Sequence, residues 1–424
     1  MKVVHICHTD IKWGASRAAF GIFNSLKNLD TDATMLVQKK YSTDEKVLDL
    51  SRSWFEDKLT KSRIILDLMP MYIFTKRSKG RFSFGNIGKD ITKHRLIKEA
   101  DVINLHWINE GFLSIKNISE LNKINKPLFW TLHDMWTFTG GCHYAGSCIR
   151  YLDSCGLCPY LKTPGEKDFS YRILKKKKKL LKKNKLTIIT PSKWLKECAE
   201  KSSLLKDFPV EVIPYAIDLN LYKPSDKIRA RKELKLPDDK ILILFGSMSA
   251  KDERKGFRFF KKSLSVLYNQ KPQLRDQIKI LVFGRADEEM KKDIPFEIFF
   301  WGRISGDKTL VSLYNASDFF VAPSTEDNYP NTVMESLACG LPVVAFNIGG
   351  LPDMISHKKN GFLATPQDAE SLMEGINWLI SNKGQIDLRE TARKLVVERN
   401  NPERISELYF QLYKNAIKKI SGNI

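Results

Sequence analysis

Basic residues able to bind phosphate follow three successive apolar runs in the second half of the chain. Lys255 stands directly before a glycine after the run ILILFGS, and the next two runs end in Gly-Arg pairs, at Arg285 and Arg303. Lysine offers a point charge and arginine a planar fork to a phosphate group, and glycine lets the backbone approach a ligand closely. The pattern predicts a phosphate-binding edge in this half of the chain.

Residues 321–350 combine a short apolar strand, a polar loop and a helix, which we expect to run from about Asn331 to a C-terminal cap at Gly340. The backbone amides at the start of this helix, at Tyr329, Asn331 and Thr332, predict an anion-binding site. A second apolar strand follows the helix, so the polar loop connects two strands of one sheet.

Two carboxylates belong to the same segment. Glu335 lies about one turn into the expected helix, where a carboxylate can accept two hydroxyls of a ribose. Asp327 precedes it by eight residues (335 − 327), at the tip of the loop, where it can touch a bound sugar. A surface carboxylate at Asp327 and a buried capping residue at Glu335 are the alternatives.

Alternating apolar runs and helical stretches predict an α/β fold of two doubly wound, Rossmann-like domains. We place the domains at residues 1–224 and 225–424, with the last helix expected to be able to pack back on the first domain. Because ligands bind beyond the carboxyl ends of parallel strands, we expect the active site in a cleft between the domains. The expected strands are MKVVHIC, ATMLVQ, DVINLHW, PLFWTLH and LTIITPS, then ILILFGS, KILVFGR, EIFFWGR, DFFVAPS and PVVAFN.

Composition narrows the classes of function. The 424 residues are 42% apolar and 28% charged, which excludes a disordered or fibrous chain. The net charge of +21 predicts an anionic partner, and the absence of a binding module disfavours nucleic acid. No apolar run is long enough to span a membrane, and the N-terminal run is too short for a signal peptide. We therefore expect a cytoplasmic protein.

Two basic stretches predict contact with an anionic membrane surface. Residues 171–186, YRILKKKKKLLKKNKL, contain nine basic residues and no acidic one. Residues 61–82, KSRIILDLMPMYIFTKRSKGRF, flank apolar side chains with Lys and Arg. Basic side chains beside apolar ones suit the interface of an anionic bilayer, so we expect peripheral binding at the inner face of the cell membrane. A solvated helix face is the alternative for the first stretch.

Four of the seven cysteines form a compact group, Cys142, Cys148, Cys155 and Cys158, which ends in C-x2-C. Four thiolates suit tetrahedral zinc, and His133 or His143 is able to replace one of them. In a reducing compartment a metal is favoured over disulfides. The group predicts a structural zinc site, with four reduced thiols as the alternative.

Several segments along the chain resemble one family, the retaining glycosyltransferases of family 4, which have the GT-B fold. Asp327 and Glu335 resemble its E-x7-E motif, with Asp in place of the first Glu. Ser247 stands where many relatives have a phosphate-binding Arg, for which Arg254 is the candidate substitute. The other matching segments are Gly14-Ala15-Ser16-Arg17, residues 190–195, 213–218, Lys255-Gly256 and Asn360-Gly361-Phe362, while Leu105-His106-Trp107 and residues 131–136 resemble the surface-polysaccharide branch.

The resemblance implies a hexosyltransferase that moves a sugar from a UDP- or GDP-linked donor to a saccharide or lipid-linked acceptor, with retention of configuration. It implies no cofactor for catalysis and no metal at the diphosphate. The catalytic residues it implies are His133, Asp327 and Lys255, with His133 contacting the donor sugar. The donor-binding residues it implies are Gly14, Arg17, Ser247, Arg254, Lys255, Arg303, Asn328, Tyr329, Asn331, Thr332 and Glu335.

Two other classes of function fit the same fold. One is a nucleotide-sugar epimerase or a phosphorylase-like enzyme, against which the chain shows no obvious lysine for a pyridoxal cofactor. The other is a non-catalytic binding protein, which the departures at Asp327 and Ser247 keep open. Release of nucleotide from a defined donor separates the transferase from the binding protein.

Overall fold

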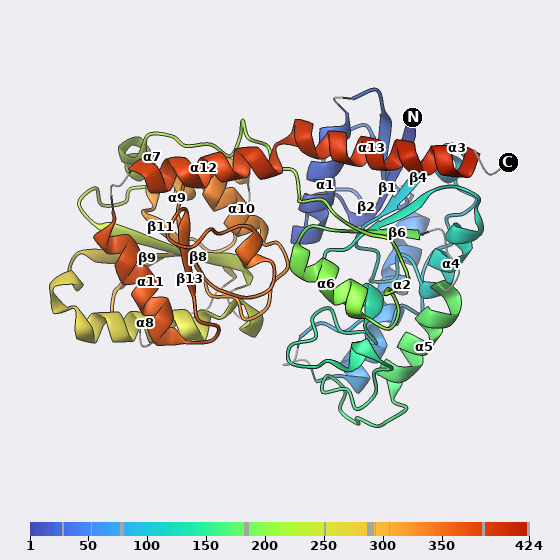
Figure 1. Ribbon diagram of the computed structural model, residues 1–424, viewed down its shortest axis with the longest axis horizontal. Coiled ribbons are helices and arrows are strands. Elements are labelled where there is room, and N and C mark those ends of the chain that lie inside the picture. Colours follow the sequence, from blue (N-terminus) through green and yellow to red (C-terminus); the bar gives the residue numbers. More distant parts are fainter. Residues whose placement is uncertain are drawn as a thin grey trace. The chain divides into compact units, whose positions relative to one another are not determined.

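The computed structural model describes residues 1–421 except 28, 52, 77–79, 182–185, 250–251, 286–291, 293, 305 and 384–385. The chain divides into two compact units, unit 1 with residues 1–216 and 402–424 and unit 2 with residues 217–401. The division lies between Ala216 and Ile217 rather than after Pro224, and the final helix belongs to unit 1. Each unit is built on one parallel sheet (Figure 1).

Unit 1 contains a seven-stranded sheet in the order β3-β2-β1-β4-β5-β6-β7, and all its strand pairs are parallel. Its strands are β1 (Lys2–Thr9), β2 (Asp32–Lys39), β3 (Val47–Asp49), β4 (Val102–Leu105), β5 (Leu128–Thr131), β6 (Leu186–Thr190) and β7 (Val210–Val212). Its α-helices are α1 (Gly14–Leu26), α2 (Trp54–Phe74), α3 (Arg95–Glu99), α4 (Ile115–Lys123), α5 (Phe169–Leu181), α6 (Lys193–Lys201) and α13 (Pro402–Ser421).

Unit 2 contains a six-stranded parallel sheet in the order β10-β9-β8-β11-β12-β13. Its strands are β8 (Ile241–Ser249), β9 (Ile278–Arg285), β10 (Glu297–Phe300), β11 (Phe319–Ala322), β12 (Val343–Phe346) and β13 (Gly361–Ala364). Its helices are α7 (Lys227–Glu233), the 3-10 helix η4 (Glu253–Lys255), α8 (Phe257–Gln270), α9 (Asp307–Ala316), α10 (Asn331–Ala338), α11 (Ala369–Ser381) and α12 (Ile386–Asn400).

The predicted α/β class and both doubly wound sheets are confirmed. Every expected strand exists, because strands buried on both faces of a parallel sheet read as continuous apolar runs. Three strands were not predicted: β3, β7 and β13 have only three or four residues, and half-buried positions interrupt their apolar pattern. All three are edge strands, where fewer side chains are buried and the apolar pattern in the sequence is weaker.

The strand order reverses direction at the same place in both units. In unit 1, β1 pairs with β2 on one side and with β4 on the other; in unit 2, β8 pairs with β9 and β11. Crevices at such switch points, beyond the carboxyl ends of the strands, are where doubly wound sheets bind ligands. The loops after β1, β4, β8 and β11 therefore border the switch points of the two sheets.

Helix α13 is tied to the core of unit 1 and packs against α1 (Figure 1). Its buried Tyr413 hydroxyl accepts a hydrogen bond of 2.7 Å from the Asn104 side chain on β4. Its Tyr409 hydroxyl lies 3.3 Å from that of Thr131 on β5. No helix among the described residues is long and apolar enough to cross a membrane.

Candidate functional site

The phosphate-binding edge predicted for unit 2 contains an ion pair between Lys255 and Asp327. Lys255 is the last residue of η4, after β8, and its Nζ lies 2.6 Å from Oδ2 of Asp327, in the loop after β11. The guanidinium of Arg254 lies 3.5 Å from the other carboxylate oxygen. Asp327 is only 5% exposed, so the surface-carboxylate alternative for this residue is wrong. Two cations and one anion thus lie at the carboxyl ends of neighbouring strands.

Backbone contacts hold the two loops together. The amide of Thr325 donates to the carbonyl of Arg254 at 2.8 Å. Gly256 has a φ of +71°, and a Cβ there would lie 1.7 Å from the carbonyl oxygen of Pro323, so only glycine fits. The Asp327 carbonyl accepts a hydrogen bond from Gly350, which fixes its loop from the other side. The position of Lys255 beside Asp327 is therefore set by the backbone of both loops.

Burial raises the pKa of Asp327, but the charges of Lys255 and Arg254 outweigh it, so the net pKa lies below the usual value. The side chain of Ser324 and the amide of Asn328 also donate to this carboxylate, at 3.2 and 3.1 Å. Asp327 is consequently ionised at neutral pH and balances one of its two cations, while Asp252 lies 3.3 Å from the guanidinium of Arg254.

Further groups suited to an anion lie around the cluster. The hydroxyl of Ser247, near the end of β8, is buried and has no hydrogen-bond partner within the described chain. Helix α10 begins after Pro330, whose side chain has no polar atom to cap the first turn. Asn331 and Thr332 occupy that turn, while the side chain of Tyr329 bonds to Asn400 at 3.0 Å. Helix amides and an unpaired hydroxyl can both donate to phosphate oxygens.

Glu335, predicted to hold a ribose, is 5% exposed and lies within α10. One of its carboxylate oxygens accepts a hydrogen bond of 3.0 Å from the hydroxyl of Tyr314 on α9. Tyr314 is fully buried, and burial raises its pKa well above the usual value, so it donates as a neutral phenol. The structure orients Glu335 through a partner that the sequence did not indicate.

Arg303 stands apart from this arrangement. It is exposed and follows β10, the edge strand of the sheet, which β9 separates from β8. The glycine before it accepts a hydrogen bond of 2.7 Å from Gly284 at the end of β9. The three strands whose ends were predicted to bind phosphate, β8, β9 and β10, are thus neighbours in the sheet. Arg303 follows the outermost of them, β10.

The remaining predicted residues belong to unit 1. Gly14 and Arg17 open α1, directly after β1, and no atom lies within 4 Å of where a Cβ on Gly14 would be. The amide of Arg17 donates to the carbonyl of Trp13 at 2.8 Å, the first turn of that helix. The start of α1 therefore stands at the switch point of the first sheet, with open space above its glycine.

His133 lies in a hydrogen-bonded row of imidazoles after β5. Its Nδ1 is 2.7 Å from the hydroxyl of Tyr215, and its Nε2 is 3.2 Å from Nδ1 of His106. His106 in turn lies 2.9 Å from His5 on β1. Burial lowers the pKa of His133 to about 4 and that of His5 to about 3, so this row is neutral at pH 7. Any contact of His133 with a sugar must replace one of these bonds.

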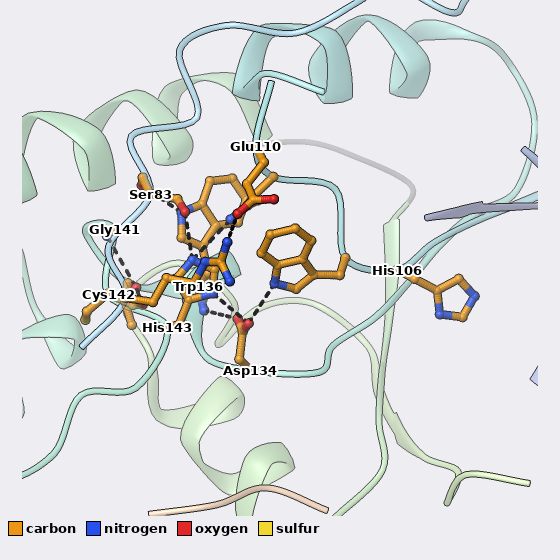
Figure 2. A network of polar contacts seen from close by, with 12 residues as sticks. Ser83, His106, Glu110, Asp134, Trp136, Gly141, Cys142 and His143 are labelled. Carbon is orange, nitrogen blue, oxygen red and sulfur yellow. Dashed lines mark hydrogen bonds and ion pairs between the residues drawn. The ribbon is translucent and has the colours of Figure 1, made fainter. Parts of the chain in front are cut away.

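Figure 2 shows a second polar network, which joins the loops after β4 and β5. Asp134 accepts hydrogen bonds from the Trp107 indole at 3.1 Å and from Nδ1 of His143 at 2.7 Å. Nε2 of His143 lies 2.8 Å from the hydroxyl of Ser83. Burial lowers the pKa of His143, so its contact with Asp134 is a hydrogen bond from a neutral ring. Hydrogen bonds thus join residues 105–107 to residues 131–136, the two segments that resemble the polysaccharide branch.

The four cysteines predicted to bind zinc line one cavity of about 20 Å³, and all are free thiols. Burial raises the pKa of Cys155 to about 12 and that of Cys158 to about 11. In the described parts of the chain, no group of three or more His, Cys, Asp or Glu side chains is arranged to hold a metal ion. His133 and His143 are both engaged in other hydrogen bonds, as described above. Zinc at this cavity stays a prediction that requires the sulfur atoms to converge.

The basic run at residues 171–186 is structured differently from the prediction. Most of it forms α5, and residues 182–185 lie outside the described residues. Of the three leucines in this run, Leu174 and Leu181 are 0% and 1% exposed because they pack in the core of unit 1, and Leu180 is partly buried against the same core. Lys177 is also buried, and its ammonium donates to the carbonyls of Trp136 and Thr139. This run therefore offers charge to a membrane but not apolar contact.

Comparison with known proteins gives one family model and several relatives. Residues 239–382 match the model described as Glycosyl transferases group 1. The chain is 28% identical over 246 residues to an uncharacterized glycosyltransferase of Methanocaldococcus jannaschii, covering 54% of this chain and 60% of that one. It is 25% identical over 252 residues to the lipopolysaccharide 1,2-N-acetylglucosaminetransferase of Salmonella typhimurium, covering 56% and 64%. The chain thus aligns with less than two thirds of the length of these relatives.

A solved structure compares along the whole chain. Anabaena Alr3699/HepE, crystallised in complex with UDP-glucose, aligns with a TM-score of 0.64 at 17% identity, covering 98% of this chain and 100% of that one. This similarity confirms the predicted architecture of two Rossmann-like domains. The chain therefore has the GT-B fold of glycosyltransferases, and its residues 239–382 match the family of glycosyl transferases group 1.

Proposed function

We propose that the protein is a retaining glycosyltransferase that moves a hexosyl group from a UDP- or GDP-linked donor to a saccharide acceptor. The observation that carries this proposal is the cluster of Lys255, Arg254 and Asp327 at the carboxyl ends of β8 and β11. The family model covers both strands, and relatives with glycosyltransferase names support the same class. A role in polysaccharide assembly, on a lipid-linked acceptor, is the more specific form of the proposal.

In this proposal the diphosphate of the donor takes the place of Asp327 as the partner of Lys255. Negative charge grows on the leaving diphosphate as the sugar departs, and fixed positive groups stabilise that charge in the transition state. Lys255, Arg254 and the first amides of α10 supply positive potential from defined positions, and Ser247 donates its unpaired hydroxyl. These groups perform the task without a metal ion at the diphosphate.

Asp327, released from Lys255, is then able to accept a hydrogen bond from a hydroxyl of the donor sugar. Glu335 accepts hydrogen bonds from the hydroxyls of the ribose. As the bond between the anomeric carbon and the diphosphate breaks, the acceptor hydroxyl attacks that carbon from the same face and passes its proton to the leaving diphosphate. Attack from this face retains the configuration and needs no nucleophile on the protein. His133 is a neutral imidazole held in place by Tyr215, and its contact with the donor sugar stays a prediction. We propose that this chemistry takes place at the inner face of the cell membrane.

A panel of UDP- and GDP-hexoses tests the proposal. With the correct donor and a soluble saccharide acceptor, the protein should release nucleoside diphosphate, and the glycosidic bond formed should have the anomeric configuration of the donor by NMR. Absence of diphosphate release with every donor, in the presence of acceptors, would contradict transferase activity. Inverted configuration would contradict the retaining mechanism alone.

A further inference from the structure

Helix α2 presents its apolar side chains outward and its polar side chains inward. Trp54, Phe55 and Ile65 are 72%, 64% and 65% exposed, whereas Thr60 and Asp67 are 2% and 4% exposed. Nine of the seventeen large hydrophobic side chains exposed in the described chain belong to this one helix. The other six are Leu59, Leu66, Met69, Tyr72, Ile73 and Phe74. An exposed apolar patch of this extent marks an interaction surface.

Polar contacts on the inner face fix this orientation. The carboxylate of Asp67 accepts hydrogen bonds from the amides of Gly111 and Ile87 at 3.1 and 3.3 Å. Arg63 donates to the carbonyl of Gly111 at 3.3 Å and to the hydroxyl of Thr60 at 2.8 Å. A Cβ on Gly111 would lie 2.7 Å from the backbone of Arg63, so the helix approaches that loop closely. The helix cannot rotate its apolar face inward without breaking these contacts.

Basic side chains surround the outward face. The ammonium of Lys58 lies 3.6 Å from the centre of the Trp54 ring. At the other end of the helix, Lys162 donates to the carbonyl of Ile73 at 2.7 Å. Both acidic residues of the first turn are paired with lysines, Asp57 with Lys61 at 2.6 Å and Lys39 at 3.4 Å, and Glu56 with Lys89 at 3.5 Å. Lysines that extend beside an apolar face keep their charges at the level of anionic headgroups.

The basic helix α5 begins against the end of α2. The ring of Phe169, the first residue of α5, lies 4.8 Å from that of Phe74, the last residue of α2. Lys175 and Lys179 of α5 are exposed. Charge from α5 thus adds to the charge around α2, although the apolar residues of α5 face the core.

We propose that α2 lies in the headgroup region of an anionic bilayer and inserts its outward apolar face. A helix of 21 residues is about 32 Å long, and α2 has aromatic residues at both ends, as membrane-interface helices do. The lysines around this face favour an anionic lipid surface over a second copy of this chain, because two positively charged faces would repel each other. This inference rests on the proposed function in one respect: it names the membrane element that would bring the enzyme to a lipid-linked acceptor.

Flotation with phosphatidylcholine vesicles, with and without about 30% phosphatidylglycerol, tests the inference on the full chain. Wild-type protein should bind the anionic vesicles, and binding should weaken as salt rises. Phe55→Glu and Ile65→Glu should each reduce binding about tenfold or more, because each removes an inserted apolar side chain. The matched control is Ile228→Glu on α7, where the replaced side chain is 67% exposed, and it should bind like wild type.

Undiminished binding by Phe55→Glu and Ile65→Glu would overturn the proposal, as would equal binding of wild type to neutral vesicles. A dimer in light scattering that Ile65→Glu dissociates, without vesicle binding, would assign the face to a second copy instead. Nucleoside diphosphate release in solution should be the same in all these proteins. Its absence from all of them would count against the proposed function and leave the vesicle result unaffected.

Discussion

Nζ of Lys255 lies 2.6 Å from Oδ2 of Asp327, so the cation expected to bind a diphosphate is already paired with a carboxylate. Donor binding must therefore exchange one anionic partner for another. The exchange leaves Asp327, itself buried, with Arg254, Ser324 and Asn328 as partners and one donor fewer. A sugar hydroxyl can supply one, which links recognition of the diphosphate to recognition of the sugar.

Asp327→Asn should separate these two roles. Free nucleoside diphosphate should bind about fivefold more tightly, because the carboxylate charge of this largely buried pair no longer competes for Lys255, a gain of about 1 kcal/mol. Sugar transfer should nonetheless slow. Calorimetric titration and turnover measurements check this, with Glu253→Gln, on the same turn as Lys255, as control. Weaker diphosphate binding by Asp327→Asn would show that no such competition exists.

Glu335→Gln should chiefly raise the KM for the donor, because a ribose contact is made equally in the ground state and the transition state. Tyr314→Phe removes the hydroxyl that orients this carboxylate and should shift KM in the same direction by a smaller factor. Steady-state kinetics with a fixed acceptor measure both. A fall in kcat at unchanged KM would contradict the ribose assignment.

The free energy of unfolding should decrease as the pH falls below about 6.5, well above the pKa range of carboxylates. Burial lowers the pKa of His133 to about 4 and that of His5 to about 3. Unfolded histidine has a pKa near 6.5, so below that pH the unfolded state binds protons that the folded state does not. The stabilising contribution is complete above pH 6.5 and is lost as the pH falls toward 4, by about 1 kcal/mol per histidine for each pH unit.

Urea unfolding at pH 7.0 and 5.0, both chosen within about two units of the unfolded pKa, measures this loss. His133→Asn should lose less stability between the two pH values than wild type does. Equal unfolding free energies of the wild type at both pH values would contradict neutral, buried imidazoles in the folded chain.

The zinc prediction has a direct test in elemental analysis. If the thiols that line the cavity converge on a metal, the purified protein should hold close to one zinc per chain. Cys155→Ser with Cys158→Ser should then remove the metal and lower the melting temperature. Metal-free protein with unchanged stability and activity would leave four reduced, buried thiols as the correct description.

Much of the fold could be predicted because apolar runs alone locate the strands of a doubly buried parallel sheet. Lys255 and Asp327 were each selected from the sequence, but their pairing was not. It depends on the hydrogen bond between Thr325 and Arg254 and on the contact of Gly256 with Pro323, which join loops far apart in the chain. Contacts of that kind leave no periodic pattern.

The partners of the selected residues were missed for the same reason. Tyr215 belongs to residues 213–218, which resemble the family, but the resemblance did not indicate that its hydroxyl bonds to His133. The basic run was misinterpreted, because its many lysines drew attention away from the helical spacing of the apolar residues. This spacing places Leu174 and Leu181 on the buried side of α5. For α2, the sequence showed apolar residues beside Lys and Arg. It did not show which of these side chains face outward.

The most direct test of the account is the rate of nucleoside diphosphate release by Lys255→Ala, measured against wild type and against Lys262→Ala, an exposed lysine on α8. Because Lys255 would act on charge that grows as the sugar departs, the account predicts a fall in kcat of about two to three decades, roughly 3–4 kcal/mol, with a much smaller change in donor affinity. Lys262→Ala should match wild type. Wild-type donor binding and turnover in Lys255→Ala would contradict the assignment of this cluster to the donor diphosphate.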